Sequence, residues 1–165
     1  MWMNPPDSTM GEGVVVAILD SGINNDHPSF ADVGSDGYDH TNPLGSDNYL
    51  PGSYCDVSDP GFCNDKLIGA WSFVSEAVTP NDSDGHGSQT ASTVAANVVA
   101  DLELEAPTTS AFFDISGVAP HANIIAYDVC IDGCPFSALL GALDQVVVDA
   151  GELPNGIAAL NYSIS

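Results

Sequence analysis

Three stretches of the chain have the apolar character of buried strands. Residues 14–19 are apolar throughout and rich in valine, residues 122–129 are dominated by apolar side chains, and residues 157–165 form a third strand-like run. A strand that does not alternate apolar and polar positions is buried on both faces, as in the middle of a parallel sheet. We therefore predict three strands of a parallel sheet.

Two helices are predicted between these strands. Residues 88–99 are rich in alanine and serine, which would let a helix approach neighbouring backbone closely. Residues 135–151 carry apolar side chains at helical spacing, with Pro135 suited to the first turn and Gly151 to the end. Alternation of strands and helices predicts an α/β fold, a parallel sheet with helices on both faces.

The remaining chain is predicted to form loops. Residues 23–66 are rich in aspartate, proline and glycine, and Lys66 closes this region at the start of a short apolar stretch. Residues 101–116 are also predicted to be a loop.

The charge of the chain is strongly one-sided. Aspartate and glutamate number 23, Lys66 is the single lysine or arginine, and the formal net charge is −22. Nothing can neutralise phosphates, so we exclude nucleic acid and anionic membrane surfaces as partners. No apolar run is long enough to span a membrane. Most acidic side chains should lie on a solvated surface, and the alternative that some of them bind structural calcium stays open.

The four cysteines form two close pairs, Cys55 with Cys63 and Cys130 with Cys134. Each pair closes a short turn, which favours local disulfides and an oxidising, extracellular setting. Zinc is the alternative, since the spacing of the second pair alone suits a zinc site. The longer spacing of the first pair fits zinc less well.

Two side chains that could carry chemistry lie at the ends of predicted elements. Asp20 follows the first strand, and His86 lies between Gly85 and Gly87 at the start of a predicted helix. Functional groups gather at the carboxyl ends of strands in α/β sheets, and an aspartate that orients a histidine supplies two members of a catalytic triad. The alternative is that both are ordinary turn and loop residues. The glycines would let the backbone approach another segment closely.

The sequence around these two residues resembles a known family. Residues 16–23, followed by residues 27–30, look like the aspartate motif of the subtilisin-like serine proteases, or subtilases. Residues 84–95 look like the histidine motif of that family, with Gln89 in place of a common histidine. The resemblance covers nearly the whole chain from about Gly13 onward.

Further segments are similar to one branch of the family. Residues 63–70 and the region of Cys130 and Cys134 resemble the larger, cucumisin-like subtilases, whose catalytic domains often carry an inserted protease-associated domain. Residues 117–120 are similar to the segment before the next strand of the family. This branch generally does without bound calcium, so the resemblance implies no cofactor and no metal residues.

The resemblance implies roles for particular residues. It makes Asp20 and His86 catalytic, within a partial subtilisin-like fold. It also places Ser163, Ile164 and Ser165 on a strand that lines the cleft for a peptide or protein substrate, with Ser165 where the family usually has glycine.

The serine of the family motif does not occur among the 165 residues. We therefore expect residues 1–165 to be the N-terminal portion of a secreted subtilase catalytic domain, truncated before the serine-bearing C-terminal half. This portion should be a serine-type endopeptidase by family but inactive by itself. The alternatives are a truncated or pseudo-protease fragment that only binds extended peptides, and an acidic calcium-binding module.

Overall fold

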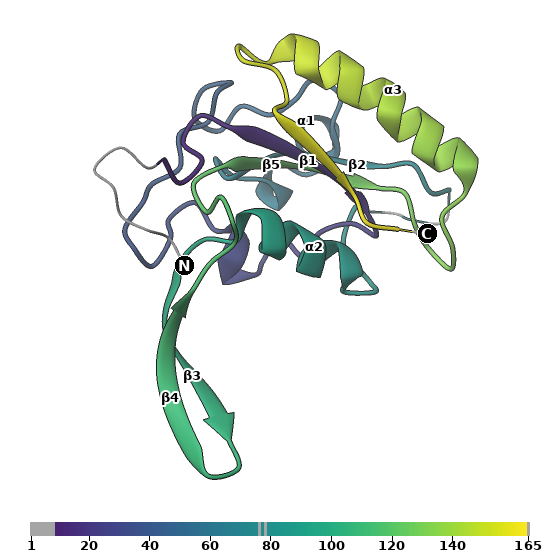
Figure 1. Cartoon of the computed structure of the whole chain (residues 1–165). Coiled ribbons are helices and arrows are strands. Elements are labelled where there is room, and N and C mark those ends of the chain that lie inside the picture. Colours follow the sequence, from purple (N-terminus) through teal and green to yellow (C-terminus); the bar gives the residue numbers. More distant parts are fainter. Residues whose placement is uncertain (1–8, 76, 78, 165) are drawn as a thin grey trace.

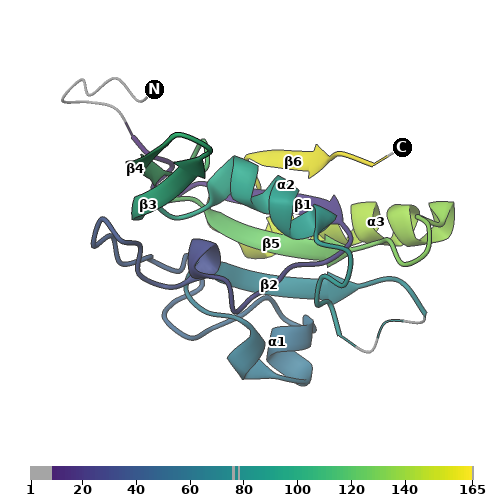
Figure 2. The ribbon, with the colours of Figure 1, turned by 90° about the horizontal axis from the view of Figure 1, so that it is seen from below.

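The apolar run that opens the chain lies inside a four-stranded parallel sheet. In the computed structural model, which describes residues 9–75, 77 and 79–164, the strand order is β2-β5-β1-β6 (Figure 2). The strands are β1 (Val15–Asp20), β2 (Leu67–Ser72), β5 (Asn123–Asp128) and β6 (Ala159–Tyr162). The three predicted strands are confirmed, the last over a shorter range, and the apolar stretch after Lys66 adds the fourth.

Helices cover both faces of this sheet. Helix α2 (His86–Ala95) lies against one face and α3 (Phe136–Glu152) against the other, on opposite sides of the strands in Figure 1. Short helical turns connect the remaining chain: α1 (Tyr54–Val57) and two 3-10 turns, Pro28–Phe30 and Pro60–Phe62. The predicted α/β fold, a parallel sheet with helices on both faces, is confirmed.

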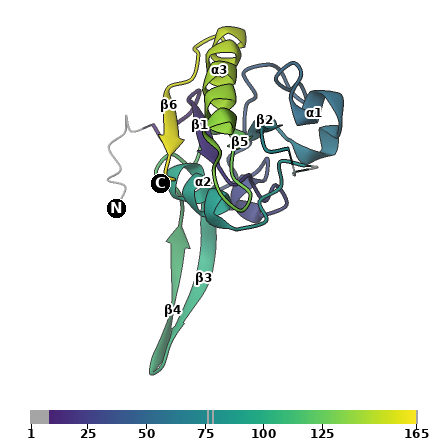
Figure 3. The same ribbon diagram turned by 90° about the vertical axis from the view of Figure 1, so that its right-hand side faces the viewer.

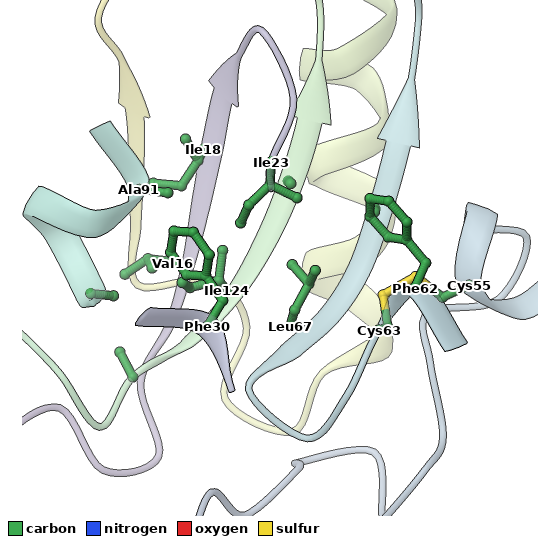
Figure 4. Packing of buried hydrophobic residues seen from close by; sticks show 14 residues of the cluster. Val16, Ile18, Ile23, Phe30, Cys55, Phe62, Cys63, Leu67, Ala91 and Ile124 are labelled. Carbon is green, nitrogen blue, oxygen red and sulfur yellow. A yellow bond between two sulfur atoms is a disulfide. The ribbon is translucent and has the colours of Figure 1, made fainter. Parts of the chain in front are cut away.

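Two hydrophobic cores explain why β1 is apolar at every position. Val16 and Ile18 pack with Ala91 of α2 in the core shown in Figure 4. Val15, Ala17 and Leu19 belong to the core on the α3 side. Because successive side chains of a strand point to opposite faces, a strand between two cores needs apolar residues throughout.

The region predicted to be the loop 101–116 is instead a β-hairpin, which corrects that prediction. Strands β3 (Val99–Ala106) and β4 (Thr109–Ile115) pair antiparallel and extend away from the sheet (Figures 1 and 3). The signal was present in the sequence: Leu102 and Leu104 alternate with acidic residues, which is the period of a strand. The density of charge hides that alternation.

The boundaries of α2 also differ from the prediction. The helix begins at His86 and ends at Ala95, so residues 96–99 lie outside it. Asn97 instead holds the neighbouring loop, because its side-chain amide donates to the carbonyl oxygens of Pro28 and Ala31. These contacts explain why the chain leaves the helix early.

Both predicted disulfides are present. One joins Cys55 to Cys63 and the other joins Cys130 to Cys134. The first lies in the core beside Phe62 (Figure 4). The second closes the turn between β5 and α3, so the zinc alternative does not apply.

Lys66 is fully buried, with 0% of its surface exposed. Its Nζ donates to the carbonyl oxygens of Pro120 at 2.6 Å and Ala122 at 2.7 Å, and no carboxylate among the residues that the structure describes bonds to it. Burial disfavours the charged ammonium and lowers the pKa of Lys66 from 10.5 to about 7. The amine therefore links the start of β2 to the start of β5. Because protonation of the buried amine is unfavourable, the stability of the fold depends on pH.

We expect the free energy of unfolding to rise as pH increases from about 7 to 10. In this window folded Lys66 has lost its proton while the unfolded side chain still holds it, so raising the pH favours the folded state. The gain should be on the order of a few kcal/mol, at about 1.4 kcal/mol per pKa unit. Urea denaturation at several pH values measures it. Lys66→Met should flatten the rise, and an unchanged slope in that variant would contradict the assignment.

Candidate active site

Asp20 and His86 meet at the carboxyl edge of the sheet. Asp20 is the last residue of β1 and His86 the first of α2, and they are 66 positions apart in the sequence. A hydrogen bond joins the two side chains, since His86 Nδ1 lies 2.7 Å from Asp20 Oδ1. The aspartate side chain is 2% exposed and the histidine side chain 45% exposed. A buried carboxylate thus contacts an imidazole that is about half exposed to solvent.

Three groups fix the orientation of the Asp20 carboxylate. The backbone N–H of Ser21 donates to Oδ1 at 2.8 Å, and the Thr90 hydroxyl donates to Oδ2 at 3.1 Å. With His86 on Oδ1 as well, both oxygens are engaged. The carboxylate therefore presents one fixed direction to the imidazole, and Thr90 is a contributor that residue types alone did not single out.

The electrostatics of the site favour a protonated imidazole. The hydrogen bond that His86 donates to Asp20, and then the charge of Asp20, raise the pKa of His86, with smaller contributions from Asp84 and Asp82. Because Nδ1 is engaged by Asp20, Nε2 is the nitrogen available for proton transfer. The pair has the geometry of a base and its orienting carboxylate.

The glycines around His86 have different roles. A Cβ atom on Gly87 would lie 2.2 Å from the carbonyl oxygen of Gly22, so the loop after β1 and the start of α2 require glycine to approach this closely. Gly85 has nothing within 4 Å of such an atom, but its φ of +95° is a left-handed conformation. Close approach was expected at both positions and holds only at Gly87.

A cavity of about 680 Å³ opens beside the pair. His86 and Asp20 line one side, and the disulfide-closed turn between Cys130 and Cys134 lines another. Ser163 and Ile164, which follow β6, also line it, whereas Ser165 lies outside the described residues. The turn was not expected at this cavity; its signal was its position directly after the carboxyl end of β5.

Another buried acid lies at the same edge of the sheet. Asp128 ends β5 next to Asp20 in the register and accepts a hydrogen bond from Ser72 Oγ at 3.0 Å. Burial raises the pKa of Asp128 to about 6, although its hydrogen bonds with Ser72 and Cys130 oppose the change. Two carboxyl groups therefore lie at the ends of neighbouring strands, and of the two only Asp20 belongs to the lining of the cavity.

Two other histidines, His121 and His40, hold parts of the structure together. His121 bridges Glu12 and Asp36, with ring nitrogens 2.7 and 2.8 Å from their carboxylate oxygens, and stacks on Tyr38. His40 Nε2 lies 2.8 Å from the side-chain oxygen of Asn97. Neither histidine lines the cavity.

The described residues offer neither a metal-binding cluster nor a membrane-spanning helix. They contain no cluster of three or more histidine, cysteine, aspartate and glutamate side chains suited to hold a metal ion. In the same part of the chain, no helix combines the length and the apolar character needed to cross a membrane.

Most of the chain matches a known protein family. A model described as the subtilase family matches residues 11–165. The chain belongs to the subtilase family. The subtilase match includes both motif segments, so the Asp20–His86 pair lies inside the matched region. Subtilases are serine endopeptidases, and this chain is homologous to them.

Curated subtilases from Arabidopsis thaliana are similar to the chain. Subtilisin-like protease SBT1.4 is 36% identical over 172 residues, which cover 90% of this chain and 20% of that protein. Subtilisin-like proteases SBT4.13 and SBT2.2 are 34% and 33% identical, covering 88% and 95% of this chain and 18% and 19% of theirs. The chain thus spans about a fifth of the length of the curated relatives it matches.

Proposed function

We propose that this chain is the N-terminal portion of a serine endopeptidase catalytic domain and supplies two members of its triad. The observation that carries the proposal is the 2.7 Å contact between His86 Nδ1 and Asp20 Oδ1 beside an open cavity. The nucleophilic serine would come from a part of the protein outside these residues, because no serine here has the sequence context of the family motif.

The proposed reaction is peptide-bond hydrolysis through an acyl-enzyme. His86 Nε2 takes the proton of the serine hydroxyl as its oxygen attacks the scissile carbonyl carbon, and then gives that proton to the leaving amine. Water next attacks the acyl-enzyme in the same way and regenerates the serine. Asp20 holds the imidazole tautomer and stabilises the imidazolium that forms in each step.

The proposed substrate is an extended peptide or protein segment. Ser163 and Ile164 follow the edge strand β6 and line the cavity, where backbone groups can pair with a substrate strand. Ser165 would extend this substrate-binding segment by one residue. Asp84 and Asp132 line the same cavity, so the substrate meets a negatively charged wall.

Two disulfides support an oxidising location for the protein. Such bonds persist in secreted proteins and in the secretory pathway and are rare in reducing compartments. We propose that the protein is secreted, in line with its two disulfides.

The test uses a longer protein that contains these residues and continues through the serine-bearing part. It should hydrolyse denatured protein substrates, lose this activity to a fluorophosphonate, and carry that label on one serine. Peptide binding without hydrolysis or labelling would support the non-catalytic alternative. Hydrolysis that survives the reagent but is abolished by a chelator would contradict the serine mechanism.

A further inference from the structure

Asp82 lies four residues before His86 and accepts five hydrogen bonds. Its Oδ1 receives the Ser21 hydroxyl at 2.9 Å and the backbone N–H groups of Asp84 and Gly85 at 3.1 and 2.8 Å. Its Oδ2 receives the backbone N–H and the hydroxyl of Ser88 at 2.7 and 2.6 Å. One carboxylate therefore contacts the chain on both sides of His86.

Two serine hydroxyls extend this contact between the two motif segments. The backbone N–H of Gly87 donates to Ser21 Oγ at 2.9 Å, and that hydroxyl donates to Asp82. The backbone N–H of Asn24 donates to Ser88 Oγ at 2.9 Å, and that hydroxyl also donates to Asp82. The loop that follows β1 and the start of α2 are thus joined through the same carboxylate.

We propose that Asp82 is the positioning residue of the Asp20–His86 pair. Asp82 acts by holding the segments that carry those two side chains, and it takes no proton from substrate. The proposal rests on the function proposed above, in which this pair is catalytic.

The backbone around His86 explains why such a residue is needed. Gly85 and Gly87 flank the histidine, and glycine has the largest conformational freedom to lose on ordering. Ser21 directly follows Asp20, so its hydroxyl connects both members of the pair to Asp82. A displacement of about 1 Å at a catalytic group can reduce the rate on the order of 10²-fold.

The chemistry at Asp82 requires an ionised carboxylate. Burial raises the pKa of Asp82, but the hydrogen bonds from Ser88, Gly85 and Ser21 outweigh it and leave that pKa below its usual value. All five contacts donate to oxygen. An amide in place of the carboxylate would turn an NH2 group toward at least one of these N–H donors, because it has a single acceptor oxygen.

A purely structural role of Asp82 would have different effects on substitution. Asp82 also stabilises the first turn of α2, and a residue that did only this would lower stability on substitution while leaving the imidazole in place. The experiment must therefore report on His86 itself.

The experiment follows the Nδ1 proton of His86 by NMR, together with kcat and KM, in the longer protein that carries the serine-bearing part. Asp82→Asn should weaken or abolish the downfield resonance of the proton shared with Asp20. It should reduce kcat on the order of 10²-fold with little change in KM. Ser21→Ala, which removes one hydroxyl bridge without leaving a buried charge, should show the same direction with a smaller effect.

Asp84→Asn is the matched control for charge. Asp84 lies on the same turn and its charge also raises the pKa of His86, but no side-chain hydrogen bond joins it to the two motif segments. This variant should shift the titration of His86 to lower pH, as loss of a nearby negative charge requires, and keep the downfield resonance.

The outcomes separate the two proposals. An intact resonance and unchanged kcat in Asp82→Asn, or in Ser21→Ala where the first variant does not fold, would overturn the positioning role. If the unsubstituted protein shows no hydrolysis, the proposed function fails. The resonance still decides then whether Asp82 holds the imidazole against Asp20.

Discussion

We expect the 165-residue chain, produced alone, to show no serine-protease turnover and no labelling by a fluorophosphonate. In the proposed mechanism His86 and Asp20 move a proton, but none of the serines here lies in the family's nucleophile motif. In subtilisin, loss of the serine alone costs about 2 × 10⁶ in kcat. Peptide hydrolysis assays and mass spectrometry of the treated chain measure both quantities.

The control for this experiment is the longer protein, treated with the same reagent under the same conditions. One label in the longer protein and none in the 165-residue chain would agree with the proposed division of the triad. Stoichiometric labelling of a serine within residues 1–165 would contradict it, because a nucleophile would then lie on this part of the chain.

In the longer protein, Asp20→Asn should leave the fold intact and reduce turnover by about 10⁴. An amide at this position can present its NH2 group to His86 Nδ1, which favours the tautomer with the proton on Nε2 and removes the base that the serine needs. His86→Ala should be at least as damaging. Steady-state kinetics, with circular dichroism to verify folding, measure the effect.

A matched substitution separates this effect from a change in net charge. Asp144 is exposed on α3 and does not line the cavity beside His86. Asp144→Asn should keep the turnover of the unsubstituted protein. Near-normal turnover in Asp20→Asn would refute the catalytic assignment of the pair.

The sheet could be predicted because its residues have one dominant constraint. Residues 14–19 are apolar since they lie between two cores, and a continuous apolar run indicates this directly. The hairpin β3–β4 does not follow from the composition, because Leu102 and Leu104 lie among acidic residues and neither is buried, with Leu104 50% exposed. In this weakly buried segment the acidic composition predicts a loop, whereas the alternation of leucine and acidic residues predicts a strand. The structure agrees with the alternation.

The candidate site was predictable only in part, for a related reason. Asp20 and His86 could be found through the motifs that surround them, and the structure joins them by a hydrogen bond. The roles of Asp82, Ser21 and Thr90 depend on which hydrogen bonds form between segments distant in sequence. Serine, threonine and aspartate are common in ordinary turns, so residue type alone gives no sign of such contacts.

The burial of Lys66 has a practical consequence for proteolysis. It is the only lysine or arginine among the 165 residues, so trypsin has a single cleavage site and that site is inside the folded protein. Cutting there requires the chain to open, and when opening is fast relative to cleavage the rate follows the population of the open form. Each product keeps its own disulfide, Cys55–Cys63 in residues 1–66 and Cys130–Cys134 in residues 67–165, so the two pieces separate without reduction. The appearance of two bands on a gel therefore measures unfolding at one known peptide bond.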